Sequence, residues 1–346
     1  MIRAHCGGSR VPVTDIPPDA FGTAAAVLNC ACGVIAKVSH MNRSQVICDR
    51  LAANPDRRQF LKSSLALAGA ASLGHGLAAE SGFRIGCWTR PWAKVDYPVV
   101  FDSVADAGYK YIGLMGLTKD GKAANITHDT PLETAAALGT EAGKRGLKAI
   151  SVWGGSFPFE KSLDTGIAGL KRLIDNCAAA GSPNLLLGGV GRPEQTDPYY
   201  KVVAECCEYA ASKGVLLGVK PHGGTNATGP ACRGLVAKVG HKNFGIWYDP
   251  GNIFYYSDGK IDPVDDAPSV DGLVVGMCVK DFRMPKEVMV TPGTGMVNFR
   301  EVMAKLKRGG FARGPLVVEC VDVRDPAQVT AQARKARLLL EDLTKI

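Results

Sequence analysis

Charged side chains stand directly after short apolar runs at several places in this chain. The run at residues 215–219 leads into Lys220 and then His222, and two other apolar runs end at Asp249 and Glu319. An isolated ammonium or carboxylate in an apolar interior is costly unless an opposite charge lies near it. We therefore expect Lys220 to be a fixed cation facing Asp249 and Glu319. Together with His222, these are the candidate catalytic residues.

Four further residues near the ends of such runs could contact a small sugar. Asn252 could hydrogen-bond a hydroxyl group, Lys280 and Asp281 offer charge, and Trp153 offers an apolar wall for the C–H face of a sugar ring. Each also has a structural interpretation, because Lys280 and Asp281 could form an ion pair that fixes a loop and Trp153 could pack in the core. Cys278 shares a strand face with Lys280, and we expect it to pack rather than to react.

The apolar runs alternate with amphipathic stretches eight times from residue 83 onward. Runs that are apolar throughout are typical of strands buried on both faces, as in parallel sheets. Eight strand–helix units in this length predict a (β/α)8 TIM barrel, an α/β fold whose active site lies at the carboxyl ends of the strands. Candidate helix C-caps are Gly108, Gly146, Gly181, Gly214, Gly240 and Gly310.

A doubly wound open sheet is the alternative to the barrel. That fold normally carries a glycine-rich phosphate loop after its first strand. The segment CWTRPWAKVD at residues 87–96 is not such a loop. We therefore favour the barrel and expect no nucleotide cofactor.

Residues 1–79 differ from the rest, and we assign them to an N-terminal extension with an export signal. The sequence RRQFLK at residues 57–62, followed by a weakly apolar run and small residues, resembles a twin-arginine signal. A start at Met41 would give this signal an ordinary length. We expect a periplasmic or otherwise exported protein that uses the twin-arginine export machinery, with the barrel in residues 80–346.

The composition narrows the range of partners. The formal net charge is +8, and no basic stripe interleaved with aromatic residues is present, so we expect no nucleic-acid partner. Seven cysteines follow residue 79 without regular spacing, and this odd number argues against a disulfide framework.

The segments LGVKPHGG, IWYDPGNI, CVKDF, TPGTGMVNF and PLVVE resemble the last four strands of the xylose isomerase-like barrels, a family of sugar phosphate isomerases and epimerases. The resemblance covers residues 83–340 and rests on the order and spacing of these segments. It implies a divalent metal such as Mg²⁺, Mn²⁺ or Zn²⁺, held by a Glu, an Asp, a His and a Glu. It also implies carboxylates that move protons through an enediolate.

Two of the four positions depart from the pattern that this resemblance implies. Lys220 stands in place of the first Glu, and Cys278 stands in place of the His. His222 could complete a ligand set with Asp249 and Glu319. Alternatively, Lys220 could take the electrostatic position of the metal, and the sequence leaves both interpretations open.

We predict an exported isomerase or epimerase that moves a proton next to the carbonyl of a small sugar or keto-sugar. The export signal argues against a phosphorylated substrate. A lyase is the first alternative, acting through a Schiff base at Lys220 or by elimination from an oxidised glycoside after α-proton abstraction. A sugar-binding barrel without turnover is the second.

Overall fold

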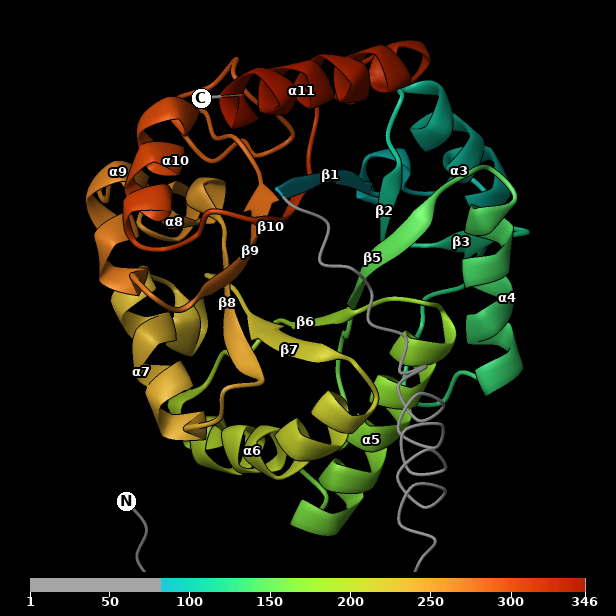
Figure 1. Cartoon of the computed structure of the whole chain (residues 1–346), viewed down its shortest axis with the longest axis vertical. Helices are drawn as coiled ribbons and strands as arrows, with labels where there is room; N and C mark the ends of the chain where they lie inside the picture. The colour runs from blue at the N-terminus through green and yellow to red at the C-terminus, as the bar shows by residue number, and fades with distance from the viewer. Residues whose placement is uncertain (1–81, 346) are drawn as a thin grey trace, which may run out of the picture. The chain divides into compact units, whose positions relative to one another are not determined.

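Eight parallel strands close into a barrel within residues 82–345, the part of the chain that this computed structural model describes (Figure 1). The strands are β1 (Phe83–Trp88), β2 (Tyr111–Leu114), β5 (Lys148–Trp153), β6 (Asn184–Leu187), β7 (Leu216–Val219), β8 (Phe244–Tyr248), β9 (Val274–Val279) and β10 (Gly314–Val318). Pairing of β1 with both β2 and β10 closes the cylinder. The predicted (β/α)8 barrel is thus confirmed, and the open sheet is excluded. The expected extension, residues 1–79, lies outside the described residues.

Helices surround the strands in an outer ring, as Figure 1 shows. They are α3 (Tyr97–Asp106), α4 (Leu132–Gly143), α5 (Leu163–Ala179), α6 (Thr196–Ser212), α7 (Gly229–Val239), α8 (Pro250–Tyr256), α9 (Pro263–Asp266), α10 (Phe299–Arg308) and α11 (Val329–Thr344). A small antiparallel ribbon, β3 (Thr118–Lys119) with β4 (Lys122–Ala123), follows β2. The six glycines predicted to end helices have φ between +64° and +95°, a left-handed conformation that favours glycine.

Two tryptophans fill the inside of the barrel. Trp88 of β1 and Trp247 of β8 are fully buried, with ring centroids 6.1 Å apart. Glycines on neighbouring strands make room for them, since a Cβ at Gly113 would lie 2.4 Å from the Trp88 ring and one at Gly276 would lie 2.6 Å from the Trp247 ring. Cys278 belongs to the same packed layer, which therefore borders the polar residues that follow the strands.

No helix in the described part of the chain is both long enough and apolar enough to cross a bilayer. The seven cysteines after residue 79 are all buried and free.

Candidate functional site

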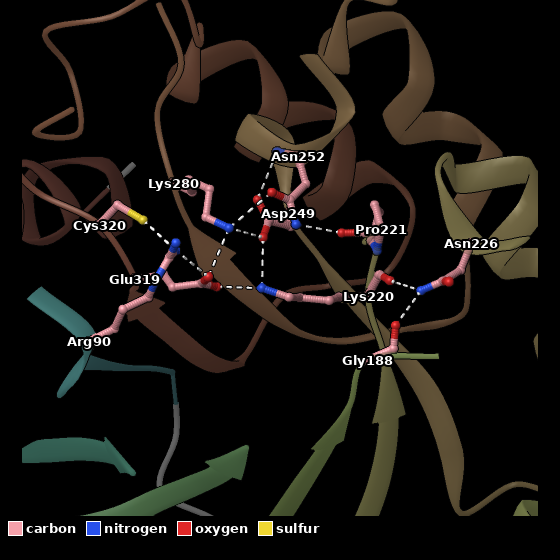
Figure 2. Close-up of polar contacts among 10 residues, drawn as sticks. All are labelled: Arg90, Gly188, Lys220, Pro221, Asn226, Asp249, Asn252, Lys280, Glu319 and Cys320. Carbon is pink, nitrogen blue, oxygen red and sulfur yellow. Dashed lines mark hydrogen bonds and ion pairs between the residues drawn. The ribbon is translucent and has the colours of Figure 1, made fainter. Parts of the chain in front are cut away.

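Lys220, Asp249 and Glu319 meet at the carboxyl ends of β7, β8 and β10 (Figure 2). The Lys220 Nζ lies 3.1 Å from Asp249 Oδ2 and 2.5 Å from Glu319 Oε2. All three residues are at most 3% exposed. The pairing that the sequence suggested is therefore present, and it explains how an ammonium is accommodated at the end of a core strand.

A second buried ammonium, that of Lys280 after β9, contacts the same two carboxylates. Its Nζ lies 3.2 Å from Asp249 Oδ2 and 2.8 Å from Glu319 Oε1, and it donates to Asn252 Oδ1 at 2.9 Å. Lys280 therefore pairs with these groups, and not with Asp281, the ion-pair partner that the sequence suggested for it.

Asp281 points away from this cluster. Its carboxylate accepts four backbone N–H groups at 2.8 to 3.0 Å, from Phe282, Gly293, Gly295 and Val297. The residue is fully buried and is not among the residues that line the neighbouring cavity. Asp281 therefore fixes the loop between β9 and α10, and the geometry gives it no contact with a substrate.

Arg90, which was not among the predicted site residues, adds a third cation. It begins a 3-10 turn after β1, and its Nη1 donates to Glu319 Oε1 at 2.9 Å and to Cys320 Sγ at 2.8 Å. Within the described residues, its Nε and Nη2 make no hydrogen bond. The cluster thus joins three cationic side chains to two carboxylates and carries one net positive charge.

These contacts keep the lysines protonated. Burial favours the neutral amine, but the carboxylates of Glu319 and Asp249 outweigh it and hold the pKa of Lys220 well above its usual value. Burial likewise opposes the charged form of Lys280, and Asp249 and Glu319 raise its pKa. A Schiff base requires a neutral amine, so this arrangement does not favour covalent chemistry at Lys220.

Glu319, the carboxylate of the cluster that lines the cavity, stays ionised. Burial alone would raise the pKa of Glu319, but Lys220, Lys280 and Arg90 outweigh burial and hold that pKa well below the usual value. A carboxylate so strongly stabilised is a weak proton acceptor. The geometry therefore gives Glu319 the role of holding the cations in place.

A cavity of about 360 Å³ opens onto this cluster. It is lined by Arg90, Met115, Trp153, Lys220, His222, Asn252, Tyr255, Tyr256, Lys280, Val288 and Glu319. Another cavity, of about 600 Å³, lies by α4, α5 and the amino ends of β2 and β5, and no carboxylate or imidazole lines it. The chemistry of the smaller cavity makes it the candidate active site.

His222 lies at the exposed mouth of this cavity. Its ring packs near Trp153 and Tyr256, with centroids 5.3 and 5.9 Å away. The surrounding protein limits hydration of the ring, and Lys220 and Lys280 repel a proton on it. The pKa of His222 consequently falls to about 4. At neutral pH it is an uncharged imidazole, and within the described residues its ring nitrogens have no hydrogen-bond partner.

Two asparagines hold the strand ends in register. Asn252 donates its Nδ2 to Pro221 O at 2.6 Å while its Oδ1 accepts from Lys280. Its amide therefore links the ends of β7 and β9, which differs from the free hydroxyl-binding group expected from the sequence. Asn226 donates to the carbonyl of Lys220 at 2.6 Å. No pattern in the sequence predicts this contact, because it depends on how the loop after β7 folds back.

The remaining aromatic residues line one side of the cavity. Trp153 ends β5, and its ring lies 5.3 Å from the Nζ of Lys220. Tyr255 and Tyr256 of α8 also line the cavity. Asp249 caps the amino end of α8 by accepting from the backbone N–H of Asn252 at 3.0 Å, so the same carboxylate positions this helix and both lysines.

The donor set does not fit a divalent metal. Within residues 82–345, Asp249, Cys278 and Glu319 have potential ligand atoms within 4.8 Å of one another, and His222 is not part of this group. The proposed His222, Asp249 and Glu319 ligand set is therefore not assembled. Each carboxylate oxygen of the two acids also already accepts from an ammonium, a guanidinium or a backbone N–H.

A family model described as xylose isomerase-like TIM barrel matches residues 101–342. The chain belongs to this family. A model of the twin-arginine translocation signal matches residues 54–74, which marks the protein for export by that pathway. A search of curated proteins found no match.

Solved structures of the xylose isomerase-like type share the fold at low sequence identity. A xylose isomerase domain protein from Planctomyces limnophilus is 20% identical, with a TM-score of 0.60, over 76% of this chain and 98% of its own. D-psicose 3-epimerase from Clostridium cellulolyticum H10 is 13% identical, with a TM-score of 0.59, over 76% and 99%. A protein described as the probable 3-DHS dehydratase of petrobactin synthesis from Bacillus anthracis is 14% identical, with a TM-score of 0.57, over 75% and 99%. Sugar epimerases and a dehydratase thus share this barrel.

Proposed function

We propose that this chain is an exported enzyme of the sugar isomerase or epimerase type that transfers a proton next to the carbonyl of a small sugar or keto-sugar. One observation carries the proposal. The cavity at the carboxyl ends of the strands combines an uncharged imidazole, that of His222, with a fixed cluster of three cations. Proton abstraction beside a carbonyl needs a base and a stabiliser of the resulting oxyanion, and the cavity offers both.

The cations of Lys220, Lys280 and Arg90 would stabilise the enediolate. When the α-proton leaves, its bonding electrons move into a C=C bond and the carbonyl π electrons move onto oxygen. One net positive charge about 5 Å from that oxygen contributes on the order of 3 kcal/mol at an effective dielectric constant of about 20, roughly a few hundredfold in rate. The free Nε and Nη2 of Arg90 supply direct hydrogen bonds to a substrate oxygen.

His222 would carry the proton. Its low pKa in the free enzyme results from limited hydration and the neighbouring cations. The enediolate adds a negative charge beside the same cations, so forming the imidazolium becomes easier as the oxyanion forms. Return of the proton to the former carbonyl carbon, while the proton of the neighbouring hydroxyl moves to the former carbonyl oxygen, gives isomerisation. Loss of the imidazolium proton to solvent, followed by delivery of a solvent proton to the opposite face of the original carbon, gives epimerisation.

The cavity suits a monosaccharide-sized ligand. Its volume of about 360 Å³ lies near the lower end of the range for small-molecule sites, ~300–1,000 Å³. Trp153, Tyr255 and Tyr256 provide apolar ring faces for the C–H groups of a sugar. Export by the twin-arginine pathway supports an unphosphorylated substrate found outside the cytoplasm.

Solvent exchange tests the proposal. The purified protein is incubated with a panel of ketoses and keto-sugars in heavy water, and deuterium at the carbon beside the carbonyl is measured by NMR. We expect exchange with at least one sugar, and a loss of ~10²-fold or more in the His222→Gln variant. Absence of exchange across the panel, together with tight binding of a sugar, would instead support the non-catalytic sugar-binding barrel.

Two further measurements address the lyase alternatives. Elimination from an oxidised glycoside would begin with the same proton abstraction but would release the aglycone, which NMR detects. A borohydride-trapped adduct at Lys220 would support the Schiff-base route and would contradict the role given to its ammonium here.

A further inference from the structure

We infer that the ammonium groups of Lys220 and Lys280 replace the divalent metal of the family pattern, and that this site binds no metal. The inference deepens the proposed function by naming what stabilises the oxyanion. It rests on the contacts of the two lysines, as Figure 2 shows.

The lysine ammonium groups occupy the space that a divalent metal would need. A divalent cation bound by carboxylates needs their oxygens at ~2.0–2.6 Å. Both lysine nitrogens lie 3.1 to 3.2 Å from Asp249 Oδ2, and they lie 2.5 and 2.8 Å from the two oxygens of Glu319. The ammonium groups bridge the same pair of acids that a metal would bridge, so ion and lysines compete for one position.

The charge of the cluster also opposes binding of a divalent metal. The cluster already carries one net positive charge in buried surroundings, and a divalent ion would raise this to three. Within the described residues, the ammonium of Lys220 donates hydrogen bonds to these two carboxylates, and it also lies over the ring of Trp153. Displacing its ammonium would leave it buried and unpaired, which is strongly unfavourable.

Lys220 also supplies the charge that the metal would have brought. Replacing the Glu of the family pattern by Lys220 changes the local charge by two units in the positive direction, which equals the charge that a divalent metal brings. The substitution therefore removes a ligand and supplies the charge of the ion at once. Cys278, in place of the His, exchanges an imidazole for a small thiol that is fully buried in the layer with Trp88 and Trp247.

Metal binding by the wild-type protein is the primary test. Protein dialysed against EDTA is titrated with Mn²⁺, Mg²⁺ and Zn²⁺ by isothermal calorimetry, and its metal content is measured by elemental analysis after equilibrium dialysis. We expect far less than one ion per chain, no shift of the thermal midpoint on adding metal or EDTA, and unchanged deuterium exchange. Stoichiometric binding, or exchange that EDTA abolishes, would overturn the inference.

A reversal of the two substitutions provides a second test. The Lys220→Glu/Cys278→His double variant restores the ligand types of the family pattern, and we expect it to bind one Mn²⁺ per chain with a rise in thermal midpoint. Lys201→Glu makes the same charge change on an exposed face of α6 and should gain no site. Should the double variant not fold, Lys220→Met, which leaves Glu319 Oε2 without its cation, is expected to bind Mn²⁺ more tightly than wild type. If neither Lys220→Met nor the wild-type protein binds Mn²⁺, this would count against Lys220 as the group that excludes the metal.

The two proposals fail in different ways. A protein without metal and without exchange activity would leave this inference standing and would remove the proposed reaction. A protein whose exchange depends on Mn²⁺ would keep the reaction and remove this inference.

Discussion

Removing the ammonium of Lys220 gives the sharpest test of the charge cluster. In the Lys220→Met variant the methionine keeps most of the buried aliphatic volume, so the main change is the loss of one charge between two acids. Breaking a buried ion pair by removing one partner costs about 3–5 kcal/mol. Asp249 keeps Lys280, and Glu319 keeps Lys280 and Arg90. We therefore expect a loss near the lower end, about 3 kcal/mol at pH 7.

Urea unfolding followed by tryptophan fluorescence measures this loss, with Lys201→Met as the matched control on the surface of α6. The pH dependence gives a second check. The folded pKa of Glu319 is below its unfolded value, so its contribution is present above the unfolded pKa and disappears as the pH falls through the folded pKa. Because the variant depresses this pKa less, the difference between the two proteins should shrink on acidification. A loss below about 1 kcal/mol at pH 7, or a difference that grows in acid, would refute the reasoning.

Arg90, His222 and Asp281 each give one further prediction. Arg90→Lys keeps the charge but removes the Nε and Nη2 donors, so kcat/KM should fall ~10–100-fold, the loss of a charged hydrogen bond of about 1.5–3 kcal/mol, while the urea midpoint stays unchanged. Unchanged kcat/KM would exclude Arg90 from substrate binding. As the pH is lowered, kcat/KM should fall with a midpoint at about pH 4, the pKa of His222. Activity is lost below that pH because the imidazole becomes protonated and can no longer accept a proton. A midpoint near pH 6.5, in protein shown by fluorescence to be folded, would contradict this environment. Asp281→Asn should lower the free energy of unfolding by about 2 kcal/mol, because an amide oxygen cannot accept all four backbone N–H groups. A loss within ~0.5 kcal/mol would mean that the loop does not depend on these bonds.

The meeting of Lys220, Asp249 and Glu319 could be predicted because each charge ends an apolar run, and parallel strands of a barrel end at one mouth. Residue type alone could not predict that Lys280 joins the charge cluster and that Asp281 does not. Alternation along a strand turns Lys280 inward, as Cys278 is, and turns Asp281 outward. That rule predicts the difference only when strand β9 continues regularly through both residues. The Arg90 contact joins residues 229 positions apart through a 3-10 turn, and no periodic pattern reports where such a turn directs a side chain.

The replacement of a metal by ammonium groups changes what the barrel can do with a substrate. A metal binds a carbonyl and a hydroxyl oxygen directly and so fixes both their positions, whereas Lys280 already donates to Asp249, Glu319 and Asn252. Its field still stabilises an oxyanion, but orientation of the sugar must come from other groups. Among the described residues that line this cavity, the Nε and Nη2 of Arg90 and both ring nitrogens of His222 make no hydrogen bond, whereas both polar atoms of the Asn252 amide already have a partner. Substrate selection should therefore depend on these two residues, and the carboxylates should affect it only through the cations they hold.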